Sequence, residues 1–186
     1  MSKVAIVGDP SGTGTFTISA PNGNTDRTLV LPDEAGTVLT SAGVPASAMP
    51  AGSVIQVVQD QFSDAYSTTS TGGTQFRAVS ITPTSASSKI LVLTSFMCRV
   101  VNPGGGNCYI RIQAFRNGTM YWDGYPVVGN YNSTDIRGVA SINYLDSPAT
   151  TSAVSYTFNY DATYAGTVYI NATTAPSMIT LLEIAQ

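Results

Sequence analysis

Apolar and polar residues alternate in short runs along most of the chain, and this alternation predicts β-strands. Runs rich in Val, Ile, Thr, Tyr and Phe are separated by Gly, Pro, Asn or Asp about every eight to twelve residues, the pattern of an all-β protein. Apolar residues at helical spacing with capping residues are missing, so we expect almost no helix. The expected strands are 15–19, 53–59, 76–82, 89–99, 108–116, 138–144, 154–160, 167–171 and 178–185.

The strands fall into two groups, which predicts a bipartite chain. Residues 1–43 carry thin hairpin elements, including the stretch "TLVLPDEAGTVLTSAG". Residues 44–52, with two Pro among small residues, are expected to form a linker. Residues 53–186 carry eight expected strands, enough for an antiparallel β-sandwich of the jelly-roll type.

The N-terminal hairpin is too small to bury its own apolar side chains. A single two-stranded hairpin is marginally stable in water. Its apolar residues therefore need a partner, and we expect that partner to be another copy of the chain. These residues are Leu29, Leu31, Val38 and Leu39.

The composition indicates a neutral, hydroxyl-rich surface. Charged residues make up 10% of the 186 residues, against about 25% in a typical soluble domain, while the chain contains 24 Thr and 20 Ser. Such surfaces suit chains that pack against other protein chains.

The sequence does not indicate binding to nucleic acid or a membrane. Its eight basic residues are scattered and form no basic patch for phosphates. No apolar run approaches the roughly 20 residues of a membrane helix, and the N-terminus is too short for a signal peptide, so we expect synthesis and retention in a cytoplasm until assembly.

Catalytic and metal-binding chemistry has little support in the sequence. The chain has no His, which excludes Ser-His-Asp and Cys-His catalysis and the common zinc sites. It has two Glu, and its Asp residues are spread out without the pairing that acid–base catalysis uses. Gly8 and Gly12 open a phosphate-loop-like stretch, but no Lys follows. We therefore expect no enzyme activity, no cofactor and no metal.

The stretch "MYWDGYPVVGNYNSTD", residues 120–135, combines aromatic rings with amide and carboxylate groups. This combination suits sugars, which offer both an apolar face and hydroxyl groups. The alternative is that the rings pack over a sheet edge or a subunit boundary. We favour packing slightly for Trp122 and exposure for 130–135. The candidate glycan or host contacts are Tyr121, Trp122, Tyr125, Asn130, Tyr131, Asn132 and Asp135.

Cys98 and Cys108 flank the turn-forming stretch "RVVNPGGGN", which predicts a hairpin. If the turn centres on Pro103, the two thiols face each other across antiparallel strands, close enough for a disulfide. In a cytoplasm thiols stay reduced. We therefore favour two buried or half-buried thiols, with a bond formed only after release to an oxidising medium.

The last expected strand has apolar residues on both faces, which predicts a central strand or a subunit boundary. Glu183 falls on the face of Ile179 and Leu181. If it is buried, its carboxylate needs a partner, and Lys89 and Arg99, from the same subunit or its neighbour, are the candidates for an ion pair that fixes the register of this strand. The alternative, a solvated Glu183 just past the apolar boundary, is equally compatible with the pattern.

Residues 14–43 resemble a module of tail-fibre and other appendage proteins of tailed bacteriophages. The matching positions are Ala20, Pro21, Thr28, Leu29, Leu31, Pro32, Gly36, Val38, Leu39 and Gly43. The later stretches "AGSVIQVVQ", "ITPTSASSKILVLTS", "YLDSPAT" and "SMITLLEIAQ" resemble the head domain that often follows this module in phage structural proteins. The resemblance is specific to virion appendages as a group.

The resemblance implies a homotrimer, in which three hairpins bury their apolar residues around a threefold axis. It also implies a non-enzymatic structural protein of the virion, made in the cytoplasm of a bacterial host. We expect a short fibre whose N-terminal module binds other virion proteins of the tail or capsid, and whose sandwich contacts host-surface glycans. The first alternative is a capsid decoration protein that stabilises the head lattice. A polysaccharide depolymerase is disfavoured by the short chain, the missing solenoid repeat and the lack of paired acids.

Overall fold

The computed structural model describes residues 10–15, 17, 22–26, 28, 44, 48–104, 106–130, 135–164, 166–172 and 175–186, with the side chains of 125–127 and 130 left out. The chain divides into two compact units, Met1–Val38 and Leu39–Gln186. Every strand that the structure describes belongs to the second unit. The hairpin residues Leu29, Leu31, Val38 and Leu39 lie outside the described residues, as does most of the expected strand 15–19.

The described part of the second unit consists of β-strands and their connections, without an α-helix. Its strands are β1 (Val54–Phe62), β2 (Tyr66–Thr68), β3 (Thr74–Ile81), β4 (Lys89–Val101), β5 (Cys108–Arg116), β6 (Thr119–Asn130), β7 (Asp135–Ala140), β8 (Asn143–Asp146), β9 (Val154–Thr163), β10 (Thr167–Ile170) and β11 (Ser177–Ile184).

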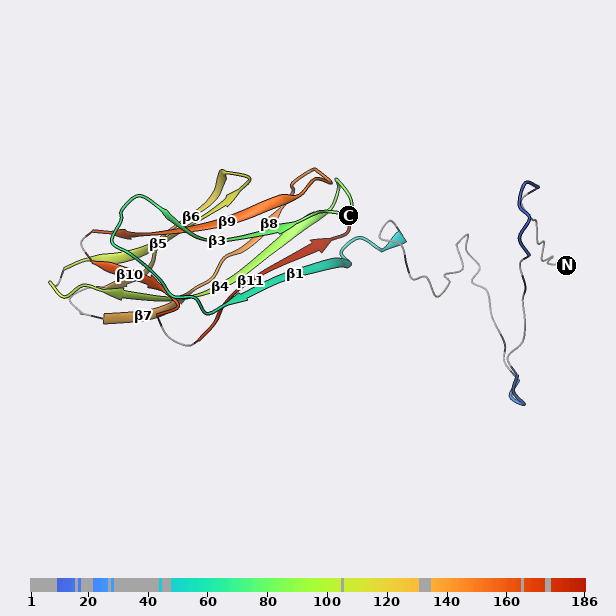
Figure 1. Cartoon of the computed structure of the whole chain (residues 1–186), viewed down its shortest axis with the longest axis horizontal. Helices are drawn as coiled ribbons and strands as arrows, with labels where there is room; N and C mark the ends of the chain where they lie inside the picture. The colour runs from blue at the N-terminus through green and yellow to red at the C-terminus, as the bar shows by residue number, and fades with distance from the viewer. Residues whose placement is uncertain are drawn as a thin grey trace. The chain divides into compact units, whose positions relative to one another are not determined.

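These strands form two sheets that face each other (Figure 1). The larger sheet has the order β1-β11-β4-β10-β2, and β7 and β8 pair with the other edge of β4. The smaller sheet has the order β3-β9-β5-β6, and all strand pairs of both sheets are antiparallel. The expectation of an all-β antiparallel sandwich is confirmed.

Strand β4 organises the larger sheet because it is long enough to pair with two strands on each side. Its first half pairs with β11 and β8, and its second half with β10 and β7. The sheet therefore behaves as four long strands, three of which are interrupted midway. If each interrupted strand is counted as one long strand, successive strands alternate between the two sheets through most of the chain. This alternation is the arrangement of a jelly roll.

One interruption has a clear local cause. The amide of Thr94 donates to the carbonyl of Ile142, and the amide of Ile142 donates to the hydroxyl of Thr94, both over 3.0 Å. The Thr94 side chain thus takes the place of a backbone acceptor, which breaks the regular ladder. The single strand expected at 138–144 is therefore observed as β7 and β8.

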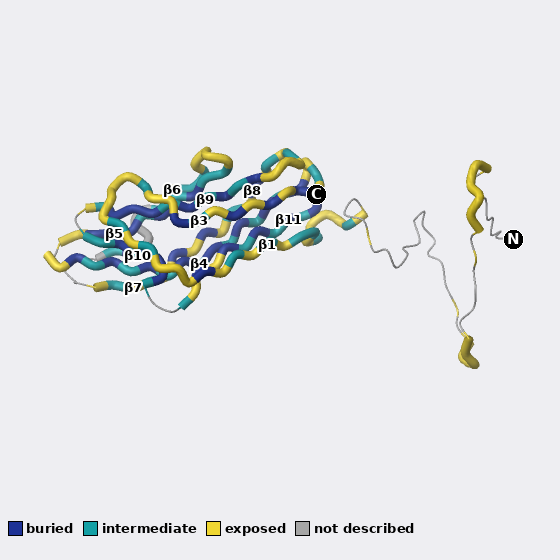
Figure 2. Tube along the Cα trace, viewed as in Figure 1, coloured by how far each residue is buried: buried dark blue, intermediate teal, exposed yellow. Residues whose placement is uncertain are grey.

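The buried residues lie on strands of both sheets (Figure 2). Among them is a cluster of aromatic rings. The ring of Phe96 on β4 packs edge-on against Phe76 at 5.1 Å and Phe158 at 5.3 Å between centroids, and Tyr160 contacts Phe76 at 5.4 Å. Each fully buried ring of this size contributes about 2–3 kcal/mol by the hydrophobic effect. Buried and half-buried residues alternate strictly along β4. The buried side chains point into the core, and the half-buried ones point to the outer face of the larger sheet.

Polar side chains also join the two sheets. Arg77 on β3 donates to Asp60 on β1, with 2.9 Å between Nη2 and Oδ1. Asp146 on β8 accepts hydrogen bonds of 2.7 Å from both Tyr156 on β9 and Arg116 on β5. These contacts fix how the sheets lie on each other.

The hairpin expected around Pro103 is wrong. Strand β4 belongs to the larger sheet and β5 to the smaller one, so the turn between them crosses from one sheet to the other. Cys98 pairs with Ile170 and Gly138, and Cys108 pairs with Asn130. Both thiols are free and buried.

Candidate assembly and contact surfaces

An apolar row crosses the outer face of the larger sheet. The register aligns four side chains side by side on β1, β11, β4 and β8, namely Val57, Leu182, Leu91 and Leu145. The two ends of the row are open to solvent, with Val57 57% and Leu145 50% exposed, while the two central leucines are half-buried. In-register apolar side chains on a solvent-facing sheet are unusual, because antiparallel sheets commonly place polar residues there.

The positions on either side of the row mix apolar residues with uncharged polar ones. We call the whole surface the apolar face; it consists of Val54, Val57, Gln59, Gln61, Lys89, Leu91, Leu93, Ser95, Asn143, Leu145, Met178, Thr180, Leu182 and Ile184. Among these described positions Lys89 is the single charged residue, and it is the first residue of β4. The face therefore offers apolar contact and neutral hydrogen bonds.

The outer face of the smaller sheet has the opposite character. The register aligns Gln75, Asn159, Gln113 and Asp123 across β3, β9, β5 and β6, and we call these four residues the polar row. Gln75 and Asp123 are exposed, and the two central residues are half-buried. The sandwich thus has one outer face suited to protein packing and one suited to contact with water or polar ligands.

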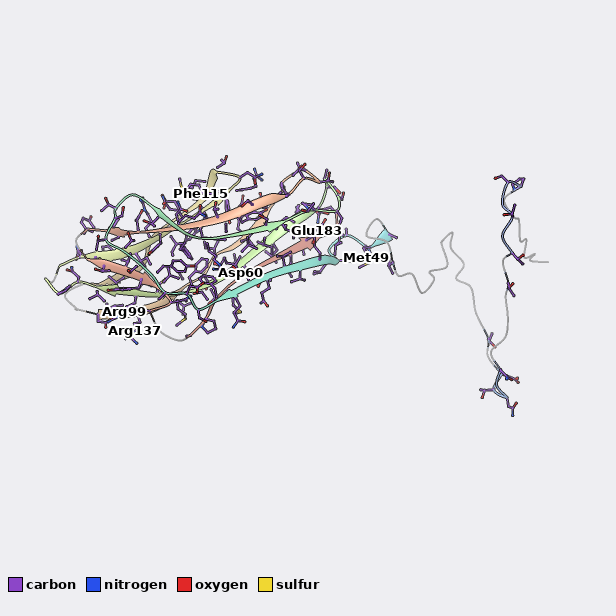
Figure 3. All side chains as sticks on the ribbon, viewed as in Figure 1. Met49, Asp60, Arg99, Phe115, Arg137 and Glu183 are labelled. Carbon is purple, nitrogen blue, oxygen red and sulfur yellow. The ribbon has the colours of Figure 1, made fainter. Side chains whose placement is uncertain are left out.

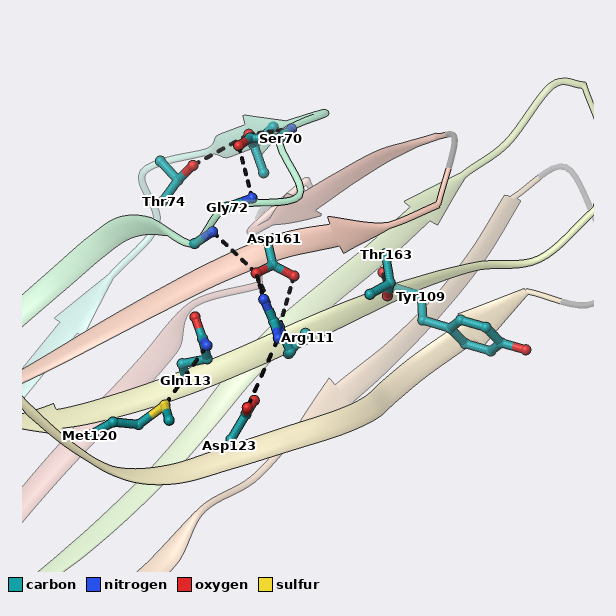
Figure 4. A network of polar contacts seen from close by, with 12 residues as sticks. Ser70, Gly72, Thr74, Tyr109, Arg111, Gln113, Met120, Asp123, Asp161 and Thr163 are labelled. Carbon is teal, nitrogen blue, oxygen red and sulfur yellow. Dashed lines mark hydrogen bonds and ion pairs between the residues drawn. The ribbon is translucent and has the colours of Figure 1, made fainter.

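Beside the polar row, an ion pair between a half-buried Arg and a buried Asp anchors the β2–β3 loop (Figure 4). Asp161 on β9 is fully buried, and Arg111 on β5 donates to it with Nε at 3.0 Å from Oδ2. The amide of Gly73, in the loop, donates to the same oxygen over 3.1 Å. Asp123 lies farther from Arg111, at 3.9 Å. Asp161 therefore neutralises Arg111 and holds the loop against the sheet.

Two of the proposed glycan contacts pack within the sandwich edge. The ring of Tyr121 stacks on Tyr144 at 4.6 Å between centroids and meets Tyr156 edge-on at 6.1 Å. Burial raises the pKa of Tyr121. The ring of Trp122 covers Gly124, where a Cβ atom would lie only 1.8 Å from it. Both rings are on the edge strand β6 and pack against the core. This is the alternative to glycan contact in which the rings pack over a sheet edge.

The remaining glycan candidates are not brought together in the described structure. The side chains of Tyr125 and Asn130, and all of Tyr131 and Asn132, lie outside the described residues. Asp135 forms an ion pair with Arg99, with 2.7 Å between Oδ2 and Nη2 (Figure 3 labels Arg99). Glycan contact through these residues stays a prediction.

Glu183 is fully buried, and within the chain neither of the partners expected for it, Lys89 and Arg99, pairs with it among the described residues. Arg99 binds Asp135 instead, and no ion pair among the described residues joins Glu183 to Lys89. Its carboxylate accepts neutral donors, from Gln56 over 2.8 Å and from the amide and hydroxyl of Thr84 over 2.7 and 2.8 Å. Burial alone raises the pKa of Glu183, and these hydrogen bonds outweigh it and lower the pKa below its usual 4.5.

A pocket of about 340 Å³ opens at the end of the sandwich where β1 begins and β11 ends. It is lined by Met49, Ile55, Thr84, Ser85, Ser87, Ser88, Ala185 and Gln186. None of these side chains ionises near neutral pH. Within the described residues, no group of three potential metal ligands occurs, and no helix is long and apolar enough to cross a membrane.

The fold and these surfaces define the chain as a β-sandwich protein. No protein-family model matches it, and no curated protein matches it. The similar solved structures include the Gt strain of infectious bursal disease virus, with 11% identity, a TM-score of 0.39 and 72% of this chain covered. They also include a VP2 subviral particle of that virus, with 10% identity, a TM-score of 0.37 and 72% of this chain covered. A further one is dimeric latent PorU from Porphyromonas gingivalis, with 12% identity, a TM-score of 0.30 and 73% of this chain covered. The chain spans 39%, 39% and 14% of the length of these three proteins, respectively.

Proposed function

We propose that this chain is a non-enzymatic structural protein of a virion that acts as a homotrimer. The apolar face carries the proposal, because a broad, almost uncharged sheet face is the property of a protein that functions in an assembly. Residues 14–43, which resemble the appendage module of tailed bacteriophages, support the virion as that assembly. The jelly-roll arrangement occurs in viral capsid domains but also in lectins and enzymes, so the fold adds only weak support.

The chemistry of the chain supports a structural role. The sequence has no His and only two Glu, and one of these, Glu183, is buried among neutral donors that serve the fold. The pocket at the end of the sandwich has no acid or base in its lining. A polysaccharide depolymerase, which needs two carboxyl groups flanking its substrate, remains the disfavoured alternative.

We place the protein as a short fibre, attached to tail or capsid proteins by its N-terminal module and turning its sandwich outward. The polar row supports an outward contact, because amide and carboxylate groups can hydrogen-bond to sugar hydroxyls on a host surface. The alternative, a capsid decoration protein, is supported by the same apolar face, which would equally suit packing on a head lattice.

Labelling of the particle tests this proposal. Antibodies raised against the purified protein should bind intact virions of the phage that encodes it, seen by electron microscopy at a tail or at isolated appendages. Label spread over the head lattice would favour the decoration alternative and contradict the fibre. Virions without label, together with no peptide of the chain in their mass spectrum, would overturn the virion role.

A further inference from the structure

We propose that a pair of arginines at one end of the larger sheet binds the anionic group, a carboxylate or a phosphate, of an acidic sugar. The arginine pair consists of Arg99 on β4 and Arg137 on β7. That the sugar belongs to a host-surface glycan rests on the proposed function, whereas the anion site follows from the side chains themselves.

The two arginines lie directly opposite each other on neighbouring antiparallel strands. Their side chains therefore leave the same face of the sheet, with Cβ atoms about 4.5–5.5 Å apart. Like charges placed in this way repel each other and destabilise a sheet. Because local choices that oppose the fold are expected at functional sites, this repulsion indicates that the paired positive charge has another use.

One arginine of the pair is neutralised and the other is left open. Arg99 donates to Asp135 over 2.9 Å from Nε and over 2.7 Å from Nη2. The hydrogen bond from Arg99 keeps the pKa of Asp135 below its usual value, and the charge of Arg137 contributes to the same shift. In the part of the chain that the structure describes, Arg137 forms no ion pair, although each of the other four arginines there forms at least one. Two guanidinium groups and one carboxylate leave one positive charge in excess.

The geometry of the arginine pair suits an anion with two or more oxygens. The Cζ atom of Arg99 lies 5.4 Å from the centroid of the Tyr169 ring, so Tyr169 and Asp135 together hold this guanidinium in place. Arg137 is exposed and offers a planar set of N–H donors. Such a set matches the oxygens of a carboxylate or a phosphate, which it can bind through two parallel hydrogen bonds.

The neighbours of the arginine pair suit the rest of a sugar ring. Val139, the next outward residue of β7, is 53% exposed and offers an apolar surface for the C–H face of a sugar. Ser67 on β2 lies opposite Tyr169 and is exposed, so its hydroxyl can bond to sugar hydroxyls. A carboxylate on Arg137 would thus bring the sugar over neutral residues.

The position of the arginine pair suits contact with a host surface. Figure 3 labels Arg99 and Arg137 at one end of the sandwich and Glu183 at the other. The chain enters the sandwich at the end of Glu183, where Val54 pairs with Ile184. The arginine pair therefore lies at the end of the sandwich opposite to the connection with the N-terminal module.

Titration of the full-length protein with two acidic sugars tests the inference. The probes are trigalacturonate, which carries carboxylates, and glucose 6-phosphate. The neutral controls are the methyl ester of trigalacturonate and glucose. We expect at least one acidic probe to bind by calorimetry, to shift the NMR signal of the Arg137 Nε–H group and to bind more weakly as salt is added, and neither control to bind. The probe that binds shows whether the site accepts a carboxylate, a phosphate or both.

Variants of the same protein assign the binding to the arginine pair. Arg137→Gln should weaken it about 10-fold or more, because a charged donor is lost, and should change Tm little, because no described carboxylate pairs with this residue. Arg137→Lys keeps the charge without the planar set of donors and should lose part of the affinity. Lys89→Gln is the matched control, since it removes the same charge from the outer face of the same sheet at the other end of β4, and should bind like the wild type.

Three results would overturn the inference. They are no binding of either acidic probe, equal weakening by Arg137→Gln and Lys89→Gln, and tighter binding of a triglutamate peptide than of both sugars, which would indicate an acidic protein segment as the ligand. Any of them alongside normal labelling of virions would leave the proposed virion role intact.

Discussion

The carboxylate of Glu183 accepts a hydrogen bond from the backbone amide of Thr84, with 2.7 Å between the nitrogen and Oε1. Glu183 belongs to the last strand of the larger sheet, and Thr84 to the connection that brings the chain from β3 of the smaller sheet to β4. One buried side chain therefore ties the end of the chain to a crossover between the two sheets.

Replacing Glu183 should destabilise the sandwich. In Glu183→Gln the new amide group meets Gln56 or Thr84 donor to donor, and the charge-assisted hydrogen bonds are lost, at a cost of about 2 kcal/mol. We expect a fall in Tm of about 4–8 °C by calorimetry. The same change at an exposed site, Asp64→Asn, should shift Tm by less than a third of that, because the Asp64 side chain is 70% exposed. Equal small shifts would mean that the Glu183 carboxylate does not support the fold.

Acid should weaken this contribution. Because the folded protein lowers the pKa of Glu183 below its usual 4.5, the stabilisation is complete above that pH and is lost as the pH falls through the lowered value. The difference in unfolding free energy between wild type and Glu183→Gln, measured in urea, should be largest at pH 7 and shrink at pH 3. A difference that stays constant or grows in acid would contradict the assignment.

The ion pair beside the polar row should be similarly important for stability. Asp161→Asn leaves Arg111 without its close counter-charge next to a buried position and should cost about 3 kcal/mol in urea unfolding. Asp123→Asn is the matched control, because Asp123 faces the same guanidinium from 3.9 Å and is 40% exposed, so its change should cost less than about 1 kcal/mol. Comparable losses in the two variants would show that burial of Asp161 does not decide the strength of the pair.

The two thiols should be unreactive in the folded protein. Burial raises the pKa of Cys98 to about 12 and also raises the pKa of Cys108, so little thiolate exists at pH 8. A thiol reagent such as DTNB should titrate neither group in the native protein and both after denaturation. Rapid reaction of one thiol, or a mass two units lower that reveals a disulfide, would contradict this.

Much of the sandwich was predictable because its strands keep a strict two-residue period. The strand at 108–116 is observed with the same bounds, and those at 89–99 and 154–160 differ only at one end. Strand β6 was missed because Gly124, Gly129 and a cluster of aromatic rings interrupt its alternation. The rings of Trp122 and Tyr109 in fact cover these two glycines, so the glycines belong to the packing of the strand and do not mark a loop.

Contacts between distant segments were the part that the sequence could not supply. A turn such as that at Pro103 is compatible with a hairpin and with a crossover between sheets. Which of the two forms depends on the strands that β4 and β5 pair with. Burial of Glu183 was one of two open alternatives, but its donors Gln56 and Thr84 lie 127 and 99 residues away. The apolar row depends on the register of four strands. A local sequence pattern cannot predict that register.

The mass of the full-length protein in solution tests the central claim most directly. Multi-angle light scattering at micromolar concentration should give three times the chain mass of 19.4 kDa, because the proposed function is that of a homotrimer. A mass of 19.4 kDa under the same conditions would contradict the account.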